Sequence, residues 1–161
     1  MDYTIRAMKE EDIEQVQTVA KISWHHTYDG IIPFAIQDKF LQSAYNSGML
    51  KRRMEFSFLF VAEAEGKVVG FANYSSVKDN GEVELGAIYL LPDYQGQQIG
   101  TALLQAGIKN SPNVKKVFIN VEKDNQTGKN FYHAKGFKIV ASFEENFDGY
   151  MLQTIRMVLE V

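Results

Sequence analysis

The stretch that most constrains the fold runs from Glu82 to Leu104. An apolar run, Leu85–Leu91, is stopped by Pro92, and a polar, glycine-containing turn then leads into the helix-like residues 99–104. This order predicts a buried strand, a loop and a helix in direct succession. The first amides of a helix have no partners inside it and lie at the positive end of the helix dipole. Such a loop is a natural phosphate site, so an anionic cofactor is the first hypothesis.

Two common phosphate-binding loops do not fit this stretch. A nucleotide-triphosphate loop needs a lysine directly after its second glycine, whereas Gly100 is followed by Thr101. A dinucleotide loop needs three glycines in the spacing Gly-x-Gly-x-x-Gly, whereas Gly96 and Gly100 are four positions apart. Both classes of nucleotide site are therefore excluded for this loop.

The segment Gln95–Gly100 resembles the Gln/Arg-x-x-Gly-x-Gly/Ala loop of the GNAT superfamily of acetyl-CoA-dependent N-acetyltransferases. It differs at Gln98, where the family usually has glycine. The loop binds through main-chain amides, so a glutamine can still donate there if its φ is negative. The alternative is a strand-to-helix turn whose glycines serve packing alone.

A second segment, Asn125–Phe137, resembles the other GNAT signature, Asn-x-x-Ala-x-x-Phe-Tyr-x-x-x-Gly-Phe. Gly128 stands where that signature usually has alanine. From the residues alone, the segment is a short helix begun by Asp124 or Asn125 and closed by Gly136. A glycine inside it is expected to cost about 1 kcal/mol of helix stability. The matching positions are Asn125, Phe131, Tyr132, Gly136 and Phe137.

The resemblance implies an α+β protein with the GNAT fold, formed by residues 1–161 as a single domain. Its six- or seven-stranded, mostly antiparallel sheet is splayed at a central parallel pair and flanked by about four helices. The residue pattern agrees, because strand, helix and strand follow one another from Glu82 to Val121 and so predict a parallel pair with a right-handed connection. Asp79-Asn80-Gly81 predicts a two-residue hairpin before this central strand.

The resemblance also assigns acetyl-CoA, as co-substrate, to the split in the sheet. The strand segment Ile88, Tyr89 and Leu90 is expected to bind the pantetheine arm through its main chain, and one of its amides to polarise the acetyl carbonyl. Asn125 and Tyr132 are expected to contact the same arm. The loop residues expected to bind the pyrophosphate are Gln95, Gly96, Gln97, Gln98, Ile99, Gly100 and Thr101.

Two residues are assigned to the chemistry. Tyr132 matches the family tyrosine that protonates the departing thiolate; packing is the alternative role. An alkylamine has a pKa near 10.4 and arrives protonated, so a base must act directly or through water. Glu84 is the candidate base, and Glu82 is the runner-up because it shares the side-chain direction of Glu84 along a regular strand. The alternative is that both are solvent-facing residues at the base of a hairpin.

The acceptor is expected to be a small primary amine. Trp24 and Tyr28 can stack on a cation, and Glu82 can attract it, so these three are the predicted substrate-binding residues. The stretch 24–46 resembles bacterial small-amine acetyltransferases, including those acting on polyamines. His25 and His26 either shape this pocket or lie on the surface. Adjacent histidines on a helix point about 100° apart, so no metal site is expected.

Composition narrows the partners and the location. With 17 basic and 20 acidic residues the net charge is −3, which gives no reason to expect a nucleic acid or an anionic membrane as partner. There is no cysteine, so disulfides and a cysteine nucleophile are excluded. Neither a signal peptide nor a membrane span is evident, so a cytoplasmic location is expected. A homodimer is compatible with these features.

Three other readings stay open. The acceptor can instead be a protein N-terminus or a lysine side chain. The chain can also be a catalytically silent GNAT-like module that binds acyl-CoA, or a generic α+β binding domain. Turnover of acetyl-CoA with an amine would distinguish an acetyltransferase from the silent module. Failure to bind CoA would favour the generic binding domain.

Overall fold

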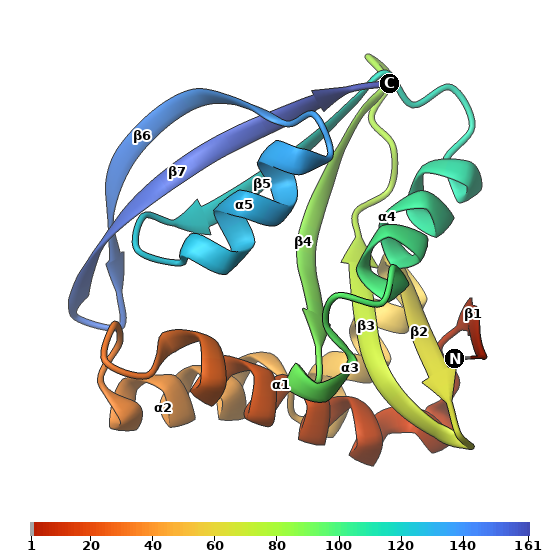
Figure 1. Cartoon of the computed structure of the whole chain (residues 1–161), viewed down its shortest axis with the longest axis horizontal. Helices are drawn as coiled ribbons and strands as arrows, with labels where there is room; N and C mark the ends of the chain where they lie inside the picture. Colours follow the sequence, from red (N-terminus) through yellow and green to blue (C-terminus); the bar gives the residue numbers. More distant parts are fainter. Residues whose placement is uncertain (1) are drawn as a thin grey trace.

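The seven strands of the protein form one mixed sheet, seen in a computed structural model that describes residues 2–161 (Figure 1). Their order across the sheet is β1-β2-β3-β4-β5-β7-β6. All neighbours are antiparallel except β4 and β5. The strands are β1 Tyr3–Ala7, β2 Phe58–Ala64, β3 Lys67–Tyr74, β4 Glu82–Leu90, β5 Lys116–Glu122, β6 Lys138–Phe147 and β7 Tyr150–Glu160.

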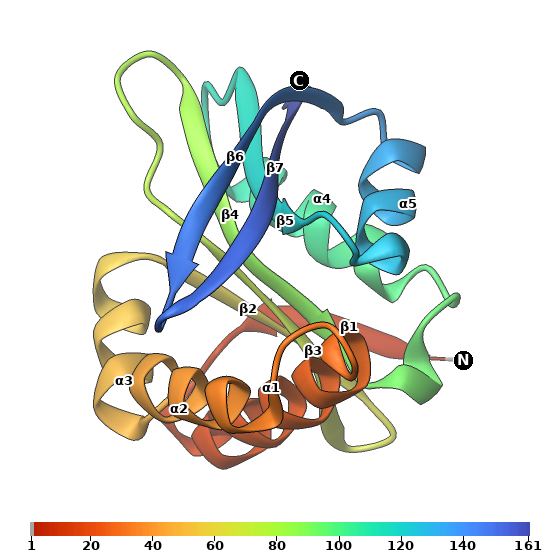
Figure 2. The same ribbon diagram turned by 90° about the vertical axis from the view of Figure 1, so that its left-hand side faces the viewer.

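Five α-helices cover the two faces of this sheet, one more than the approximate number expected. Helices α4 and α5 lie on one face, and α1, α2 and α3 lie on the other (Figure 2). Over the described residues, none of these helices combines the length and the apolar character that a membrane span requires. The cytoplasmic location stays a prediction. The helices are α1 Ile13–Tyr28, α2 Phe34–Ala44, α3 Ser47–Phe56, α4 Ile99–Asn110 and α5 Gln126–Ala134.

The central parallel pair is short, and this shortness opens the sheet. Strands β4 and β5 pair only over Glu82–Glu84 and Lys116–Phe118, although each continues for several residues beyond that point. Figure 1 shows β4 and β5 moving apart, with α5 beside β5 and α4 beside β4. The expected mixed sheet, splayed at its parallel pair, is confirmed.

A β-bulge in β4 lies just beyond this short pair. Tyr74 is opposite Leu85, whereas Asn73 is opposite Ala87, so Gly86 is the extra residue. Leu85 packs in the core beneath α4, whereas Ala87 packs with α1, so the bulge changes which face the odd-numbered residues occupy. Bulges often re-aim side chains next to functional sites.

The turn predicted at Asp79-Asn80-Gly81 before β4 forms, but its loop has three residues and not two, because the Lys78 amide donates to the Glu82 carbonyl at 2.9 Å. Regular pairing ends at Tyr74, and residues 75–81 connect the two strands. A turn does form, because Gly81 donates to the carbonyl of Lys78 at 2.8 Å. Its glycine serves a second purpose: with φ +83°, a Cβ there would lie 2.9 Å from the Asn113 carbonyl oxygen. The close contact with Asn113 and Lys115, which precede β5, therefore requires a glycine at position 81 of the turn.

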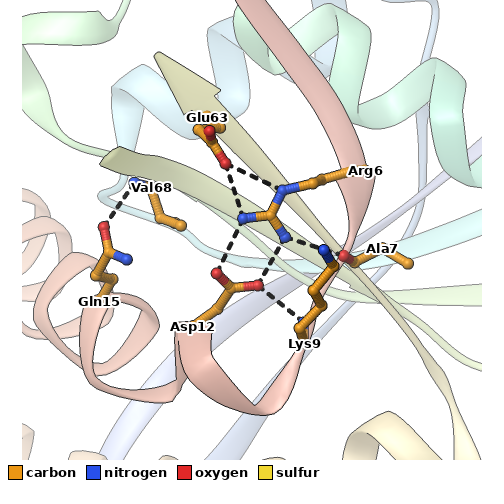
Figure 3. Close-up of polar contacts among 7 residues, drawn as sticks. All are labelled: Arg6, Ala7, Lys9, Asp12, Gln15, Glu63 and Val68. Atoms are coloured by element: carbon orange, nitrogen blue, oxygen red, sulfur yellow. Dashed lines mark hydrogen bonds and ion pairs between the residues drawn. The ribbon is translucent and has the colours of Figure 1, made fainter. Parts of the chain in front are cut away.

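An ion-pair network anchors the N-terminal strand and α1 to the sheet (Figure 3). The Arg6 guanidinium on β1 donates two hydrogen bonds to Asp12, at 2.7 and 2.9 Å, and two to Glu63 on β2, at 2.8 and 3.1 Å. Asp12 is 2% exposed and also accepts from the Lys9 amide at 2.8 Å. The hydrogen bonds from Arg6 lower the pKa of Asp12, more than burial opposes.

Asp12 should therefore make the stability of the protein depend on pH. Because its pKa is lower in the folded than in the unfolded chain, its contribution is present above the ordinary value near 3.9 and is lost as the pH falls through the folded pKa. We expect Asp12→Asn to lower the free energy of unfolding by about 1.5 to 3 kcal/mol at pH 7, the range typical of hydrogen bonds to charged groups. Urea unfolding should show this difference shrinking below about pH 4. A difference that is the same at pH 7 and pH 3 would contradict the assignment.

Candidate active site

A cavity of about 360 Å³ lies where β4 and β5 separate. Its walls come from α1, from β4 beyond the bulge, from the loop before α4, and from β5 with α5. The lining residues are Ser23, Thr27, Tyr28, 86–90, Gln95, Gly96, Gln98, Gly100, Thr101, 119–121, Asn125, Thr127, Gly128, Phe131, Tyr132, Ala134 and Lys135. The split in the sheet is therefore hollowed by a cavity to which all of these elements contribute.

The loop before α4 presents free amides to this cavity. The first helical hydrogen bond runs from the Ala102 amide to the Gln98 carbonyl, at 3.0 Å. No side chain caps the helix start, so the amides of Ile99, Gly100 and Thr101 have no helical partner. Lys135 adds a positive charge to the wall. These donors, with the helix dipole, fit the pyrophosphate of a CoA-type cofactor.

Gln98 departs from the conformation that the sequence analysis considered for it. Its φ is +68°, in the left-handed region, so the condition of a negative φ is not met. Gly96 also has a positive φ, of +77°. The chain must turn sharply between β4 and α4, and Gln98 takes the left-handed conformation that a glycine adopts without strain.

Gly100 allows α4 to approach α5. A Cβ built at this position would lie 3.2 Å from the Phe131 ring and 3.5 Å from Leu90. Gly100 is also one of the loop residues expected to bind the pyrophosphate. The structure adds a packing reason, since Gly100 both lines the cavity and contacts the ring that closes its α5 side.

Three tyrosines line the cavity from three different elements, Tyr28 from α1, Tyr89 from β4 and Tyr132 from α5. Burial raises the pKa of Tyr28 to about 12 and raises the pKa values of Tyr89 and Tyr132 above their ordinary value of 10. All three therefore carry their protons at neutral pH. Each can donate a hydrogen bond or a proton to a group in the cavity.

Asn125 both caps α5 and lines the cavity. Its side-chain oxygen accepts from the Gly128 amide at 2.9 Å, as expected for an N-cap. A Cβ at position 128 would lie only 2.7 Å from the Asn125 Nδ2 atom. The glycine that replaces the usual alanine therefore leaves room for this cap, which offsets part of its cost to the helix.

The two glutamates of β4 lie outside the cavity lining. Both Glu84 carboxylate oxygens accept from Arg156 on β7, one of them at 3.3 Å. The same guanidinium donates to Asn120 at 3.0 Å and lies 4.5 Å from the centre of the Phe118 ring. This Arg156–Glu84 brace joins β7 to β4 across β5, at the end of the split where β4 and β5 still pair. Arg156 was not identified from the sequence, because it follows no motif.

Trp24 packs behind Tyr28 in the α1 wall of the cavity. It is buried in an aromatic cluster, with ring centres 4.5 Å from those of Tyr28 and Phe40 and 5.8 Å from that of Phe147. Of the predicted substrate-binding residues, only Tyr28 lines the cavity, and Trp24 and Glu82 do not. Trp24 therefore holds Tyr28 in place instead of facing a ligand.

The two histidines lie apart from the main cavity. The Nε2 atom of His25 is 3.0 Å from an Asp38 carboxylate oxygen, and the His25 ring stacks on Phe34. His26 lines a smaller hollow beside Asn125. Within residues 2–161, no group of three or more histidine, aspartate or glutamate side chains is placed to hold a metal ion.

Most of the predicted cofactor residues come together in the cavity. Ile88, Tyr89, Leu90, Gln95, Gly96, Gln98, Gly100, Thr101, Asn125 and Tyr132 all line it. Ile99 is instead buried in the core, and the Gln97 side chain bonds the Asp93 carbonyl. The main-chain amides of these two residues belong to the same loop.

Several lining residues were missed. Ser23 and Thr27 lie one helical turn apart on α1, next to Tyr28, and this spacing was a usable signal. Glu122, at the end of β5 and outside this lining, was also not identified from the sequence. Its carboxylate accepts from the Asp124 amide at 2.7 Å, and burial raises its pKa. Its negative charge contributes to the raised pKa of Tyr28.

Comparison with known proteins gives a consistent family. The Acetyltransferase (GNAT) family profile matches residues 17–137. A spermidine N(1)-acetyltransferase of Thermoplasma acidophilum is 30% identical over 86% of this chain and 90% of its own length. An N-alpha-acetyltransferase of Sulfurisphaera tokodaii is 29% identical over 86% of this chain and 82% of its own. The crystal structure of the PaiA N-acetyltransferase of Thermoplasma acidophilum in complex with coenzyme A superposes with a TM-score of 0.85, at 25% identity and full coverage of both chains.

The left-handed Gln98 gives a test of the loop. Replacing it with glycine removes the strain of a side chain at positive φ, and we expect Gln98→Gly to raise the free energy of unfolding by about 0.5 to 1 kcal/mol. Gln97→Gly is the matched control and should lower it, because glycine gains freedom in the unfolded chain. Urea unfolding of both variants checks this. Equal losses in the two variants would show that Gln98 is unstrained.

Proposed function

Because the chain belongs to the GNAT family and is an acetyl-CoA-dependent N-acetyltransferase, we propose that its acceptor is a primary amine carried by a small molecule. A polyamine is the leading candidate. The acetyl group moves directly from the thioester to the amine, without an acetylated enzyme. The main support is that the β6–β7 hairpin packs against the α1–α2 segment, next to the α1 wall of the cavity.

The β6–β7 hairpin packs against the α1–α2 segment. Leu152, Phe147 and Tyr150 of the hairpin share one apolar cluster with Trp24 and Tyr28. The Tyr150 hydroxyl donates to the Ile31 carbonyl at 3.2 Å. A peptide acceptor needs an open groove between these two elements. Their contact supports an enclosed pocket for a small molecule.

The cofactor residues divide into two sets. The free amides of the loop before α4 would hold the pyrophosphate, and the unpaired edge of β4 from Gly86 to Leu90 would hold the pantetheine arm by strand-like hydrogen bonds. Acetyl-CoA supplies the activated thioester when it is bound. A β4 amide polarises the carbonyl that is attacked, as an oxyanion hole does.

Tyr132 is the proposed acid for the departing thiolate. It lines the cavity from α5, directly across the split from β4. Its raised pKa keeps the hydroxyl protonated throughout the physiological range, so a proton is available at each turnover.

The base is proposed to be a carboxylate acting through water. At pH 7 only about one alkylamine molecule in 2,500 is neutral, so proton removal is needed. Glu84 stays the first candidate, with Glu82 the runner-up. Because Glu84 lies outside the cavity lining, a water must relay the proton from the amine to its carboxylate. Glu122 is an alternative, because its raised pKa makes it a stronger base than an ordinary glutamate.

Two other functions remain as alternatives. The similarity to an N-alpha-acetyltransferase favours a protein N-terminus, and a lysine side chain would need the same chemistry. A silent acyl-CoA-binding module would have no use for a protonated tyrosine beside the unpaired edge of β4. The two experiments below separate these functions.

Tyr132→Phe tests the acid. This change keeps the ring and removes only the hydroxyl, so calorimetric CoA affinity should stay within about twofold of wild type. Turnover should fall by roughly 10²-fold, which is typical for the loss of an acid catalyst. Tyr74→Phe is the control: its hydroxyl bonds the Leu104 carbonyl in the core, and it should affect stability alone. Wild-type turnover in Tyr132→Phe, with chemistry rate-limiting, would rule out the acid role.

An acceptor panel tests the substrate class. We would measure CoA release with spermidine, simple alkyl diamines, free amino acids and a peptide with a free N-terminus. Diamines and spermidine should give the highest kcat/KM, because they fit a closed pocket. Acetylation of the peptide alone would refute the small-molecule acceptor, and CoA binding without release for any amine would favour the silent module.

A further inference from the structure

The glycine at the β4 bulge is not required by the conformation of the backbone. Gly86 is the extra residue of the bulge and lies inside the strand. A glycine inside a strand is destabilising, because it gives up more conformational freedom on folding than any other residue. Its φ is not positive, so residues with a side chain can adopt the same backbone conformation. The presence of a glycine at this bulge therefore needs another reason.

Packing does not require a glycine at this position either. Apart from its chain neighbours, the nearest atom to a Cβ built on Gly86 would be the Asn73 carbonyl oxygen at 3.7 Å, an ordinary contact. Every other glycine among residues 2–161 except Gly48 either has a positive φ or would place its Cβ within 3.2 Å of a neighbour. Gly48 lies on α3, outside the cavity lining. Gly86 is thus the one glycine of the described chain that lines the cavity without a backbone or packing reason.

The space beside Gly86 lies on the α1 side of the sheet. Leu85 packs beneath α4, so the alternation of side chains along the strand directs position 86 to the opposite face, which α1 covers (Figure 2). Ala87, which follows in the bulge, packs with Val19 of α1. The loop proposed to bind the pyrophosphate leads into α4, on the other face. A group that fills this space therefore approaches along α1 and not along the pyrophosphate loop.

The α1 wall of the same cavity carries hydroxyl groups. Ser23, Thr27 and Tyr28 line the cavity together with Gly86. The Ser23 hydroxyl donates to the Val19 carbonyl at 2.6 Å, so its oxygen keeps lone pairs for a donor on a ligand. Amine N–H groups are such donors. The cavity therefore offers acceptors for an amine on α1 and room for its alkyl carbon beside β4.

We propose that Gly86 determines which amines the enzyme accepts, because the space left by its missing side chain receives the carbon that bears the acceptor amine. This inference rests on the proposed function, since it assumes a small amine that enters along α1. Gly86 lies two residues beyond Glu84, where the pairing of β4 with β5 ends. The space is therefore next to the unpaired edge proposed to hold the pantetheine arm. A larger side chain at position 86 would keep the amine nitrogen away from the thioester carbonyl carbon.

Kinetics of Gly86→Ala and Gly86→Val test this role. Calorimetric CoA affinity should stay within about twofold of wild type, because the added atoms face α1. The kcat/KM for 1,4-diaminobutane should fall by about 10- to 200-fold in Gly86→Ala, the range for one methylene in a pocket, and further in Gly86→Val. The unfolding midpoint of Gly86→Ala should not fall, because the Cβ has room. Gly48→Ala is the matched control, also at an exposed glycine without a positive φ, and should keep the wild-type kcat/KM.

A pair of diamines tests the space beside Gly86 directly. The compound 2,5-diaminohexane is 1,4-diaminobutane with a methyl group beside each amine, and this methyl needs the same space. The preference for the unbranched diamine should rise at least about tenfold in Gly86→Ala. A wild type that already rejects 2,5-diaminohexane, an unchanged preference in Gly86→Ala, or a CoA affinity that falls in parallel with kcat/KM would overturn the inference. A wild type that acetylates only a peptide refutes the proposed function instead, and the ratio of kcat/KM between variant and wild type with that peptide then decides the role of Gly86.

Discussion

The structure depends on the point at which two parallel strands stop pairing. Beyond Glu84 and Phe118, β4 and β5 no longer share hydrogen bonds, and each exposes main-chain groups to the space between them. Unpaired main-chain groups inside a protein are costly unless something satisfies them. The bulge at Gly86, the capped start of α5 and the uncapped start of α4 all lie around this space. They make it a binding site and not a packing defect.

The Arg156–Glu84 brace limits how far the split extends. It joins β4 to β7 across β5, at the end where the strands still pair. The Phe118 ring lies under the guanidinium, and Asn120 accepts one of its hydrogens. A charge held in this way is stabilised by several partners at once. The brace therefore fixes the end of the split where β4 and β5 still pair, whereas among residues 2–161 no such ion pair joins the two strands where they have separated.

The sequence predicted the fold and the cofactor loop better than the acceptor side. Residues 82–104 and 125–137 carry local patterns, and these patterns placed the parallel pair, α4 and the Asn125 cap correctly. Gln98 took a positive φ because the turn geometry outweighed its preference. The roles of Glu84 and Trp24 depended on Arg156 and Phe147, which are distant in sequence and follow no period. The bulge, which changes the facing of β4 side chains, lies at Gly86, and a lone glycine inside a strand pattern is a bulge signal that was missed.

The unpaired edge of β4 links the folding of the protein to its metabolic surroundings. A ligand that completes these hydrogen bonds binds only the folded chain, so it shifts the folding equilibrium in proportion to its concentration above the dissociation constant. At a hundredfold excess this amounts to about 2.7 kcal/mol, a large share of the stability of a typical domain. The lifetime of the protein in the cell would then follow the supply of acetyl-CoA. Abundance and activity would rise together without any separate regulatory site.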